Sequence, residues 1–229
     1  AAAITALLRS AETVTQQKKG ARQTLCAAAA ALREFRHRAA ESLATRVETE
    51  LAALNFKGAR FEVRFAELAD FAESGSESAE FYIRTNPGEE IKPLRQIASG
   101  GELSRVMLAL RAVLAANDRV ETLIFDEIDA GISGRTAQLV SEKLMEISRS
   151  RQVLCITHLP QLAAMADHHY LIEKASDGSR TETEIREITG EALYLELGRL
   201  IGGAEITDGV LKTAEEMKQL AEKRKEGMR

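Results

Sequence analysis

Two acidic residues, Asp126 and Glu127, directly follow a short apolar run and are the clearest candidates for chemistry in the sequence. The run, Leu-Ile-Phe at residues 123–125, is typical of a buried parallel strand. Ligand-handling residues collect at the carboxyl ends of such strands in open α/β sheets. The alternative is that the strand simply ends in solvent, which would explain one acidic residue. It explains less well the second acidic residue, a third at Asp129 and the Gly131 that follows. The pattern favours a functional site at this strand end.

A second candidate lies at the start of a predicted helix, where residues 98–105 read Ala-Ser-Gly-Gly-Glu-Leu-Ser-Arg. Ser99 stands where an N-cap belongs, Glu102 comes three residues later, and apolar residues then recur at helical spacing. Gly100 and Gly101 would let a ligand approach the backbone, and a helix start offers free N–H groups and a positive dipole end. This combination suits an anion such as a phosphate. The alternative is an ordinary capped helix, which a lone Ser-Gly-Gly would favour.

A third candidate, His158, follows the next predicted strand. Residues 137–147 have helical periodicity, and residues 153–157 form another short apolar run. A strand, a helix and a strand of these lengths predict a βαβ unit with parallel neighbouring strands. Because the carboxyl ends of both strands then lie at one edge, we expect His158 near Asp126 and Glu127. Without that shared edge, a single histidine at a strand end would be given a structural role.

In combination, these segments resemble the motifs of the ABC ATPases. Four segments carry the resemblance in the family's order: the signature motif at 99–102, the Walker B strand at 123–127, the D-loop at 129–131 and the switch-histidine loop at 157–158. Four stretches are closest to the SMC-like branch, whose members include bacterial DNA repair proteins: residues 85–88, 94–105, 125–134 and 157–161. Ala98, Glu102 and Ile128 depart from the residues usual in ABC transporters, which argues against a transporter nucleotide-binding domain.

The resemblance implies an α/β fold. The expected fold is the C-terminal lobe of an ABC-type (P-loop NTPase) head, with a parallel sheet core, a small antiparallel β element and a long N-terminal coiled-coil helix. The expected domains are a coiled-coil arm fragment at residues 1–56 and the lobe at residues 57–229. The implied cofactors are ATP and Mg²⁺.

The resemblance also implies a role for each site residue. Asp126 would hold Mg²⁺ through water, Glu127 would orient or deprotonate the attacking water, and His158 would contact the γ-phosphate or that water. The signature residues that would clasp nucleotide held by a second protomer are Ser99, Gly100, Gly101 and Glu102. The D-loop residues Asp129 and Gly131 would reach across the dimer interface. ATP would close two heads and hydrolysis would release them, in a cycle coupled to DNA, at its ends or single-stranded regions.

No Gly-x-x-x-x-Gly-Lys-Ser/Thr sequence occurs in the chain. In the family this phosphate-binding loop belongs to an N-terminal lobe, which we expect as a partner. We therefore expect the intact protein to be an ATPase and this chain alone to hydrolyse ATP negligibly. The alternative from another class is a non-catalytic scaffold that dimerises through its helices or an exposed sheet edge.

The rest of the sequence predicts the remaining helices and strands. Residues 1–56 are rich in helix formers and carry an apolar stripe, which predicts either a truncated coiled-coil arm or a helix folded onto its own globular domain. Within it, residues 33–38 form a basic cluster that could contact DNA phosphates or, as we favour, form a solvated flank. Four further segments are predicted from alternation and turn residues: antiparallel strands at 60–65 and 80–84, a polar turn or loop at 73–78 and a hairpin at 171–174 and 183–188 around Asp177-Gly178. Amphipathic helices are predicted at 193–201 and 209–225.

Composition sets the remaining limits. The 229 residues are 45% hydrophobic, enough for a substantial core, and the net charge of −4 gives no global case for DNA binding. Cys26 and Cys155 are far apart in the sequence and form no disulfide or metal pattern, which favours a reducing compartment. No apolar run is long enough to span a bilayer. We expect a cytoplasmic, nucleoid-associated protein.

Overall fold

The computed structural model describes residues 2–115, 120–176 and 181–228. Its contacts divide the chain into two compact units. The first contains Ala1–Glu48 and Ala59–Arg95, and the second contains Thr49–Gly58 and Gln96–Arg229. The first β-strands are therefore grouped with most of the long helix. The domain division expected at residue 56 stays a prediction.

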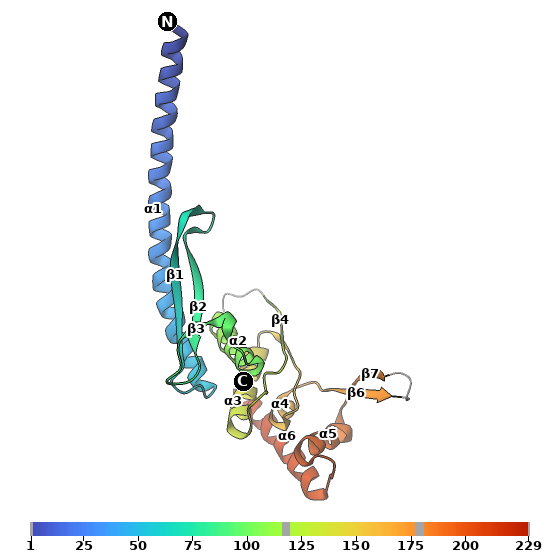
Figure 1. Ribbon diagram of the computed structural model, residues 1–229. Helices are drawn as coiled ribbons and strands as arrows, with labels where there is room; N and C mark the ends of the chain where they lie inside the picture. Colours follow the sequence, from blue (N-terminus) through green and yellow to red (C-terminus); the bar gives the residue numbers. More distant parts are fainter. Residues whose placement is uncertain (1, 116–119, 177–180, 229) are drawn as a thin grey trace. The chain divides into compact units, whose positions relative to one another are not determined.

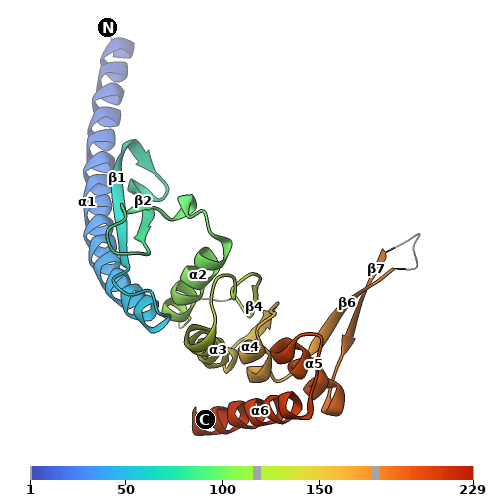
Figure 2. The same ribbon diagram turned by 60° about the horizontal axis from the view of Figure 1, so that its bottom comes forward.

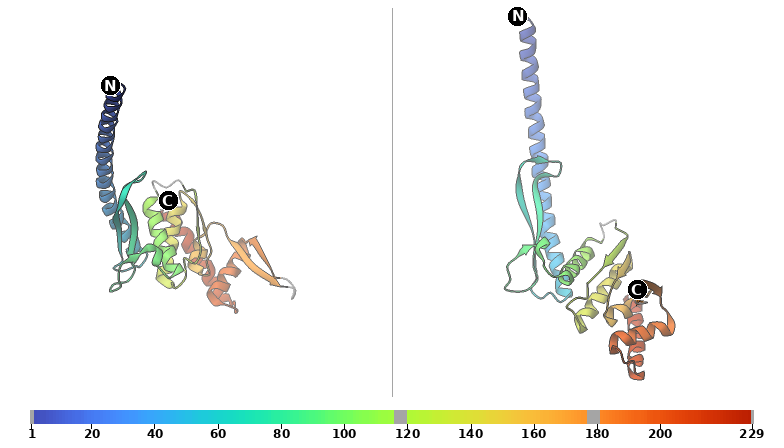
Figure 3. Two further views of the ribbon diagram at one scale, coloured as in Figure 1. Left: turned by 45° about the horizontal axis from the view of Figure 1, so that its top comes forward. Right: turned by 45° about the vertical axis from the view of Figure 1, so that its right-hand side comes forward.

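The first unit consists of a long helix and a small antiparallel sheet. Its elements are α1 (Ala2–Ala53, which continues into the second unit), β1 (Arg60–Ala72), β2 (Gly75–Arg84) and β3 (Lys92–Pro93). The expected helix and the expected antiparallel pairing of β1 with β2 are confirmed. Phe61 and Ile83, which are paired across the two strands, are both buried. The hairpin runs alongside α1 (Figures 1 and 3).

The turn of this hairpin is shorter than the sequence predicts. We expected a loop over residues 73–78, but β1 ends at Ala72 and β2 begins at Gly75. Gly75 has a φ of 110°, a conformation that a residue without a side chain adopts readily. The tight turn at this glycine therefore leaves residues 76–78 free to pair as a strand.

Two members of the basic cluster at residues 33–38, Arg33 and His37, contact the hairpin while staying partly exposed, and the interpretation of the cluster as a solvated flank stays a prediction. The side chain of Glu77 is only 3% exposed. Its Oε1 lies 3.2 Å from Arg33 Nε, and its Oε2 lies 3.2 Å from His37 Nε2. Arg33 also pairs with Glu67 at 3.0 Å, and the His37 ring stacks on Phe65 with centroids 4.1 Å apart. A buried carboxylate needs such partners, and the helix supplies them.

The amino-terminal half of α1 has no such cover. Its large apolar side chains are exposed among the described residues: Ile4, Leu8, Val14 and Leu25. Further along, Val47 and Leu51 are fully buried. The helix is therefore packed near its carboxyl end, as a helix folded onto a domain would be, and uncovered near its start, as a truncated coiled-coil arm would be.

The second unit contains the predicted βαβ segment. Its elements are the short 3₁₀ turn η1 (Leu94–Gln96, at the border of the units), α2 (Gly100–Leu114), β4 (Thr122–Phe125), α3 (Gly134–Ser148) and β5 (Gln152–Cys155). Strands β4 and β5 are parallel neighbours, with Phe125 opposite Cys155, which confirms the expected pairing. The expected burial of this strand is observed on one face only. Leu123 and Phe125 are buried, whereas Ile124 is 68% exposed because only one face of this two-stranded sheet is covered.

The remaining elements of this unit follow β5 in the chain. They are α4 (Pro160–Met165), β6 (Tyr170–Ser176), β7 (Thr181–Glu187), α5 (Gly190–Gly202) and α6 (Asp208–Met228). The predicted hairpin and both helices are confirmed, while the turn at Asp177-Gly178 lies outside the described residues. Helices α4, α5 and α6 lie together (Figure 2). A core of Met145, Met165 and Leu197 joins them to α3. No helix in the described ranges is long and apolar enough to cross a membrane.

Candidate nucleotide site

The first turn of α2 is capped as the sequence predicts. Ser99 has an extended backbone, and its hydroxyl accepts a hydrogen bond from the backbone N–H of Glu102 at 3.4 Å. The carbonyl of Ser99 accepts the first helical bond, from Leu103 at 3.0 Å. The hydroxyl thus satisfies one of the donors that a helix start leaves unpaired. The exposed Ser99 and Gly100 place this helix start at the surface of the unit.

The two glycines are packed against the loop that follows β4. A Cβ atom added to Gly101 would lie 2.6 Å from the carbonyl oxygen and 2.8 Å from the Cβ of Ala130. A Cβ atom on Gly100 would lie 2.5 Å from Oε2 of Glu127. The contact at Gly101 is with backbone, whereas that at Gly100 is with the end of a flexible side chain. The signature-like helix start and the strand-end acids therefore lie together within one chain.

Arg105 fixes this arrangement, and the sequence analysis missed it. Its Nη1 donates to the carbonyl oxygens of Ala130 at 2.9 Å and Ile128 at 3.4 Å. Its guanidinium lies over the ring of Phe56, 5.4 Å from the centroid. Burial lowers the pKa of Arg105, partly offset by the charge of Glu102. The available signal was an arginine among the apolar positions of an amphipathic helix, where a charge needs a specific partner.

Glu127 has a strained backbone. Its φ of 56° lies in the left-handed region, which costs a residue with a side chain about 1–3 kcal/mol. Its N–H is bonded to Oδ1 of Asp126 at 2.9 Å, and its carbonyl accepts from Ala130 at 3.1 Å. Both acidic side chains are exposed. Strain of this kind persists where surrounding contacts hold it and is concentrated at functional sites.

Asp129 is buried and bonded to the loop after β5. Its Oδ2 accepts from Thr157 Oγ1 at 2.6 Å and from the backbone N–H of His158 at 2.8 Å, and it lies 3.1 Å from Nδ1 of the same histidine. The backbone N–H of Leu159 donates to Thr157 Oγ1 at 3.0 Å. Hydrogen bonds to Asp129 therefore connect the loop after β4 to the loop after β5. The expected contact of Asp129 with a second protomer stays a prediction. Gly131 is exposed, with a φ of 73°.

The chemistry of these residues fits a magnesium nucleotide. Mg²⁺ is usually held by one or two carboxylates together with phosphates and water, not by a cage of protein ligands. Asp126 offers an exposed carboxylate for this purpose. The described residues contain no cluster of three or more metal-binding side chains, so the phosphates and water would have to complete the coordination.

Cys155, at the end of β5, has no nucleophilic role here. Burial raises the pKa of its thiol to about 12, and the charges of Asp129 and Asp126 add to the shift. The thiolate is the reactive form of cysteine, so this side chain stays inert at neutral pH.

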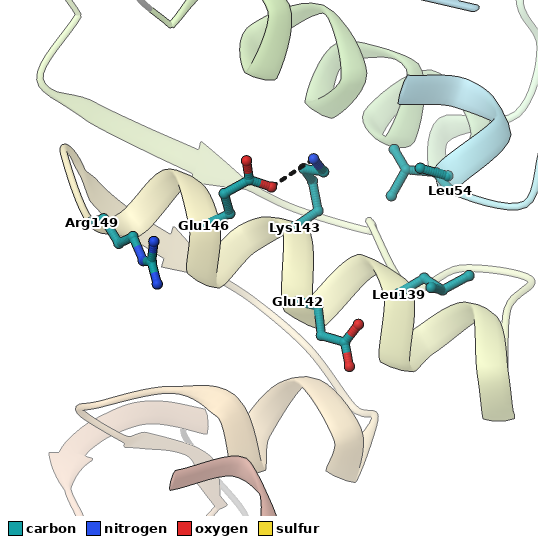
Figure 4. A pocket seen from close by; sticks show the side chains of 7 residues that line it. Leu54, Leu139, Glu142, Lys143, Glu146 and Arg149 are labelled. Atoms are coloured by element: carbon teal, nitrogen blue, oxygen red, sulfur yellow. Dashed lines mark hydrogen bonds and ion pairs between the residues drawn. The ribbon is translucent and has the colours of Figure 1, made fainter. Parts of the chain in front are cut away.

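The same unit contains a cavity of about 370 Å³ (Figure 4). It is lined by Ala53, Leu54, Leu139, Glu142, Lys143, Glu146 and Arg149. Lys143 forms ion pairs with Glu146 at 2.6 Å and Glu50 at 2.8 Å. None of the predicted site residues lines this cavity, and we assign it no role in nucleotide binding.

Comparison with known proteins identifies relatives over most of the chain. It is 45% identical to the DNA repair protein RecN of Halalkalibacterium halodurans over 196 residues, which cover 84% of this chain and 35% of that protein. It is 39% identical to the DNA repair protein RecN of Haemophilus influenzae over 223 residues, 96% of this chain and 40% of that protein. The chain therefore spans less than half of the length of these curated relatives. No protein-family model matches it.

Among solved structures, the chain resembles the Smc head domain with a coiled coil and joint from Pyrococcus yayanosii. The TM-score is 0.53 and the identity 23%, over 70% of this chain and 29% of that one. This likeness shows the fold, which is that of an SMC head: α/β, with a parallel sheet, small antiparallel sheets and a long N-terminal helix.

Proposed function

Because the chain belongs to the RecN family of DNA repair proteins, we propose that it is the C-terminal part of an SMC-like ATPase that acts in DNA double-strand break repair and recombination. In this proposal, it supplies the signature motif, the Walker B acids, the D-loop and the switch histidine to an ATP site that is completed by an N-terminal lobe and a second head. The main support for the proposal is the pair of hydrogen bonds that Asp129 accepts from Thr157 and His158. They hold the loop after Asp126 and Glu127 next to the loop that contains His158.

Three residues of this chain would have separate roles in phosphoryl transfer. Asp126 would hold Mg²⁺, which neutralises charge on the phosphates when bound. Glu127 would orient the attacking water or take its proton, and His158 would contact that water or the γ-phosphate. Such catalysis depends on positioning and electrostatics more than on covalent chemistry.

The start of α2 would act on nucleotide held by the second head. A helix start has N–H groups without helical partners and a positive dipole end, both of which suit the γ-phosphate. Of the four signature residues, Ser99 and Gly100 are exposed and would face the nucleotide directly, whereas Glu102 is half-buried and Gly101 is buried behind them. Arg105 ties this helix start to the D-loop, so that the signature motif and the residues around Asp129 and Gly131 would meet the partner as one rigid edge.

The sheet of β4 and β5 has exposed apolar side chains. Ile124, Leu154 and Ile156 are 68%, 45% and 51% exposed. Ile124 of β4 is paired with Leu154 of β5, and Ile156 directly follows β5. Parallel sheets are normally covered on both faces. We propose that an N-terminal lobe covers these side chains, and that the uncovered start of α1 pairs with the other arm of a coiled coil.

Nucleotide-dependent association tests the proposal against a scaffold. The chain is mixed with its separately expressed N-terminal lobe, and the mass of the complex is measured by analytical ultracentrifugation with and without Mg²⁺ and ATP. We expect ATP to double the mass, more stably with Glu127→Gln, because this change keeps the shape of the side chain and slows hydrolysis. Ser99→Arg should prevent the doubling, since it fills the phosphate surface. Self-association that ignores ATP in all variants would favour the scaffold instead.

A further inference from the structure

The long helix α1 ends in a turn that its own backbone holds. The N–H of Phe56 donates to the carbonyl of Leu51 at 2.9 Å, and the N–H of the preceding Asn55 donates to the carbonyl of Ala52 at 3.1 Å. These two bonds form a Schellman motif, which requires a left-handed residue after the last turn of the helix. Asn55 has a φ of 69°, a conformation that asparagine adopts more readily than most residues with a side chain. The turn therefore fixes the direction in which Phe56 leaves the helix.

Phe56 contacts the guanidinium of Arg105. The two residues are 9% and 6% exposed, and Cζ of Arg105 lies 5.4 Å from the centroid of the Phe56 ring. A cation this close to an aromatic face is attracted to it, and more strongly where water is excluded. The Nη1 group of the same arginine donates to the carbonyl oxygens of Ile128 and Ala130. Arg105 therefore contacts the end of α1 with its charge and the loop after β4 with its N–H donors.

The turn also contacts the far end of this loop. Nδ2 of Asn55 donates to Oγ1 of Thr136 at 2.9 Å, and Thr136 lies in the first turn of α3. Two consecutive residues at the end of α1 thus reach both ends of the loop between β4 and α3, Phe56 through Arg105 and Asn55 directly. All of these residues belong to the second unit.

We propose that Phe56 is a positioning residue that holds Arg105 on the loop after β4 and so keeps the D-loop beside the signature motif, while Asn55 supports the same loop at its far end. This inference rests on the proposed function and deepens it, because the edge formed by these two motifs is the one that would meet the second head. Phe56 is buried and acts through Arg105. Changing it should therefore weaken the association of two heads and leave the binding of ATP to one head unaltered.

Hydrogen exchange of this chain, without nucleotide, tests the contact itself. Phe56→Leu keeps an apolar side chain but removes the ring. The amides of Ala130 and Ile132, which are bonded within the loop, should exchange about fivefold to thirtyfold faster, as expected for the loss of a buried cation–π contact. Phe35→Leu, the same change at an exposed position of α1, should leave both rates unaltered. Unaltered rates in Phe56→Leu would overturn the proposal.

A second background separates positioning from general packing. In Arg105→Met the guanidinium is absent, so adding Phe56→Leu should change the exchange of the two loop amides by no more than about twofold. An equal acceleration in both backgrounds would mean that Phe56 supports the loop without Arg105, and the proposal fails.

The contact at Asn55 provides an independent cycle that leaves Arg105 intact. Asn55→Gly keeps the left-handed turn and removes the amide donor, whereas Thr136→Val removes the acceptor. Each change should accelerate exchange of the amides at residues 137–139 about twofold to tenfold, and the two together should do no more than either alone. Independent, additive effects would contradict the role of Asn55.

Association of the heads tests the functional part. The chain is mixed with its N-terminal lobe in the Glu127→Gln background, and two quantities are measured: the affinity for a fluorescent ATP analogue at low protein concentration and the ATP-dependent doubling of mass. We expect Phe56→Leu to leave the affinity unaltered and to weaken the doubling about tenfold, within the range set by the lost contact. Equal losses in both would mean general damage and contradict the proposal. A wild-type mixture that never doubles with ATP would refute the proposed function, whereas exchange would still decide the contact.

Discussion

Alanine at Gly101 should destabilise the fold, whereas alanine at its neighbour Gly100 should not. At Gly101 the new methyl group would lie 2.6 Å from the carbonyl oxygen of Ala130 and 3.1 Å from that of Glu127. Both oxygens belong to the backbone of the loop after β4, which cannot turn aside. At Gly100 the group met at 2.5 Å is the carboxylate end of Glu127, which can rotate toward solvent.

The expected size follows from two opposing effects at each position. Overpacking a close contact costs about 1–3 kcal/mol. Replacing glycine by alanine within a helix gains up to about 1 kcal/mol. We therefore expect Gly101→Ala to lower the free energy of unfolding by about 1–2 kcal/mol. Gly100→Ala should leave it within about 0.5 kcal/mol of the wild type or raise it slightly.

Both variants are compared with the wild type by urea unfolding followed by circular dichroism. Hydrogen exchange of the α2 amides provides the local measurement, because the contact lies at the start of that helix. The two substitutions are chemically identical and adjacent, so a difference between them reports the packing against Ala130. If Gly101→Ala is as stable as Gly100→Ala, the close packing of α2 on the loop after β4 is refuted.

Three further outcomes are expected at Arg105, at the two cysteines and at Asp167. Arg105→Met should lower the free energy of unfolding by about 2 kcal/mol in urea, because a charge-assisted bond to backbone is worth about 1.5–3 kcal/mol; a smaller loss for Arg105→Lys would agree, and no loss for Arg105→Met would contradict this. Iodoacetamide at pH 8 should alkylate the exposed Cys26 and leave Cys155 unmodified, because burial raises the pKa of the Cys155 thiol to about 12. Mass spectrometry of the native chain measures the alkylation, and modification of both cysteines would contradict this prediction. The hydrogen bond from Lys225 lowers the pKa of Asp167, so its stabilisation should be complete above the unfolded pKa of about 3.9 and lost as the pH falls through the lower folded value. Asp167→Asn should therefore lower Tm at pH 6 and lower it progressively less as the pH is reduced below about 3.9, and an equal loss of Tm at every pH would contradict this.

Much of the local structure could be predicted from periodicity and turn residues. The N-cap at Ser99, the parallel pairing of β4 with β5 and the hairpin of β6 with β7 follow from patterns a few residues long. These signals are local because each depends on the preferences of one segment and its immediate neighbour. The position of His158 beside the strand-end loop also followed, since parallel strands bring their carboxyl ends to one edge.

The contacts between distant residues could not be predicted. Glu77 is buried because Arg33 and His37 lie opposite it on α1, a pairing across about forty residues that no local pattern encodes. The bond of Arg105 to Ala130 and the inward direction of Asp129 depend likewise on how α2 packs on the loop after β4. A sequence motif gives the type of residue at a position, but not the atom that its side chain contacts.

ATP hydrolysis by this chain, mixed with its separately expressed N-terminal lobe, tests the central claim most directly. The claim is that this chain carries one half of a composite ATP site. We predict turnover that requires both parts and Mg²⁺ and is abolished by Glu127→Gln, with neither part active alone. Turnover that survives Glu127→Gln would contradict the role of this residue, and a stable complex that binds ATP but never hydrolyses it would contradict the claim itself.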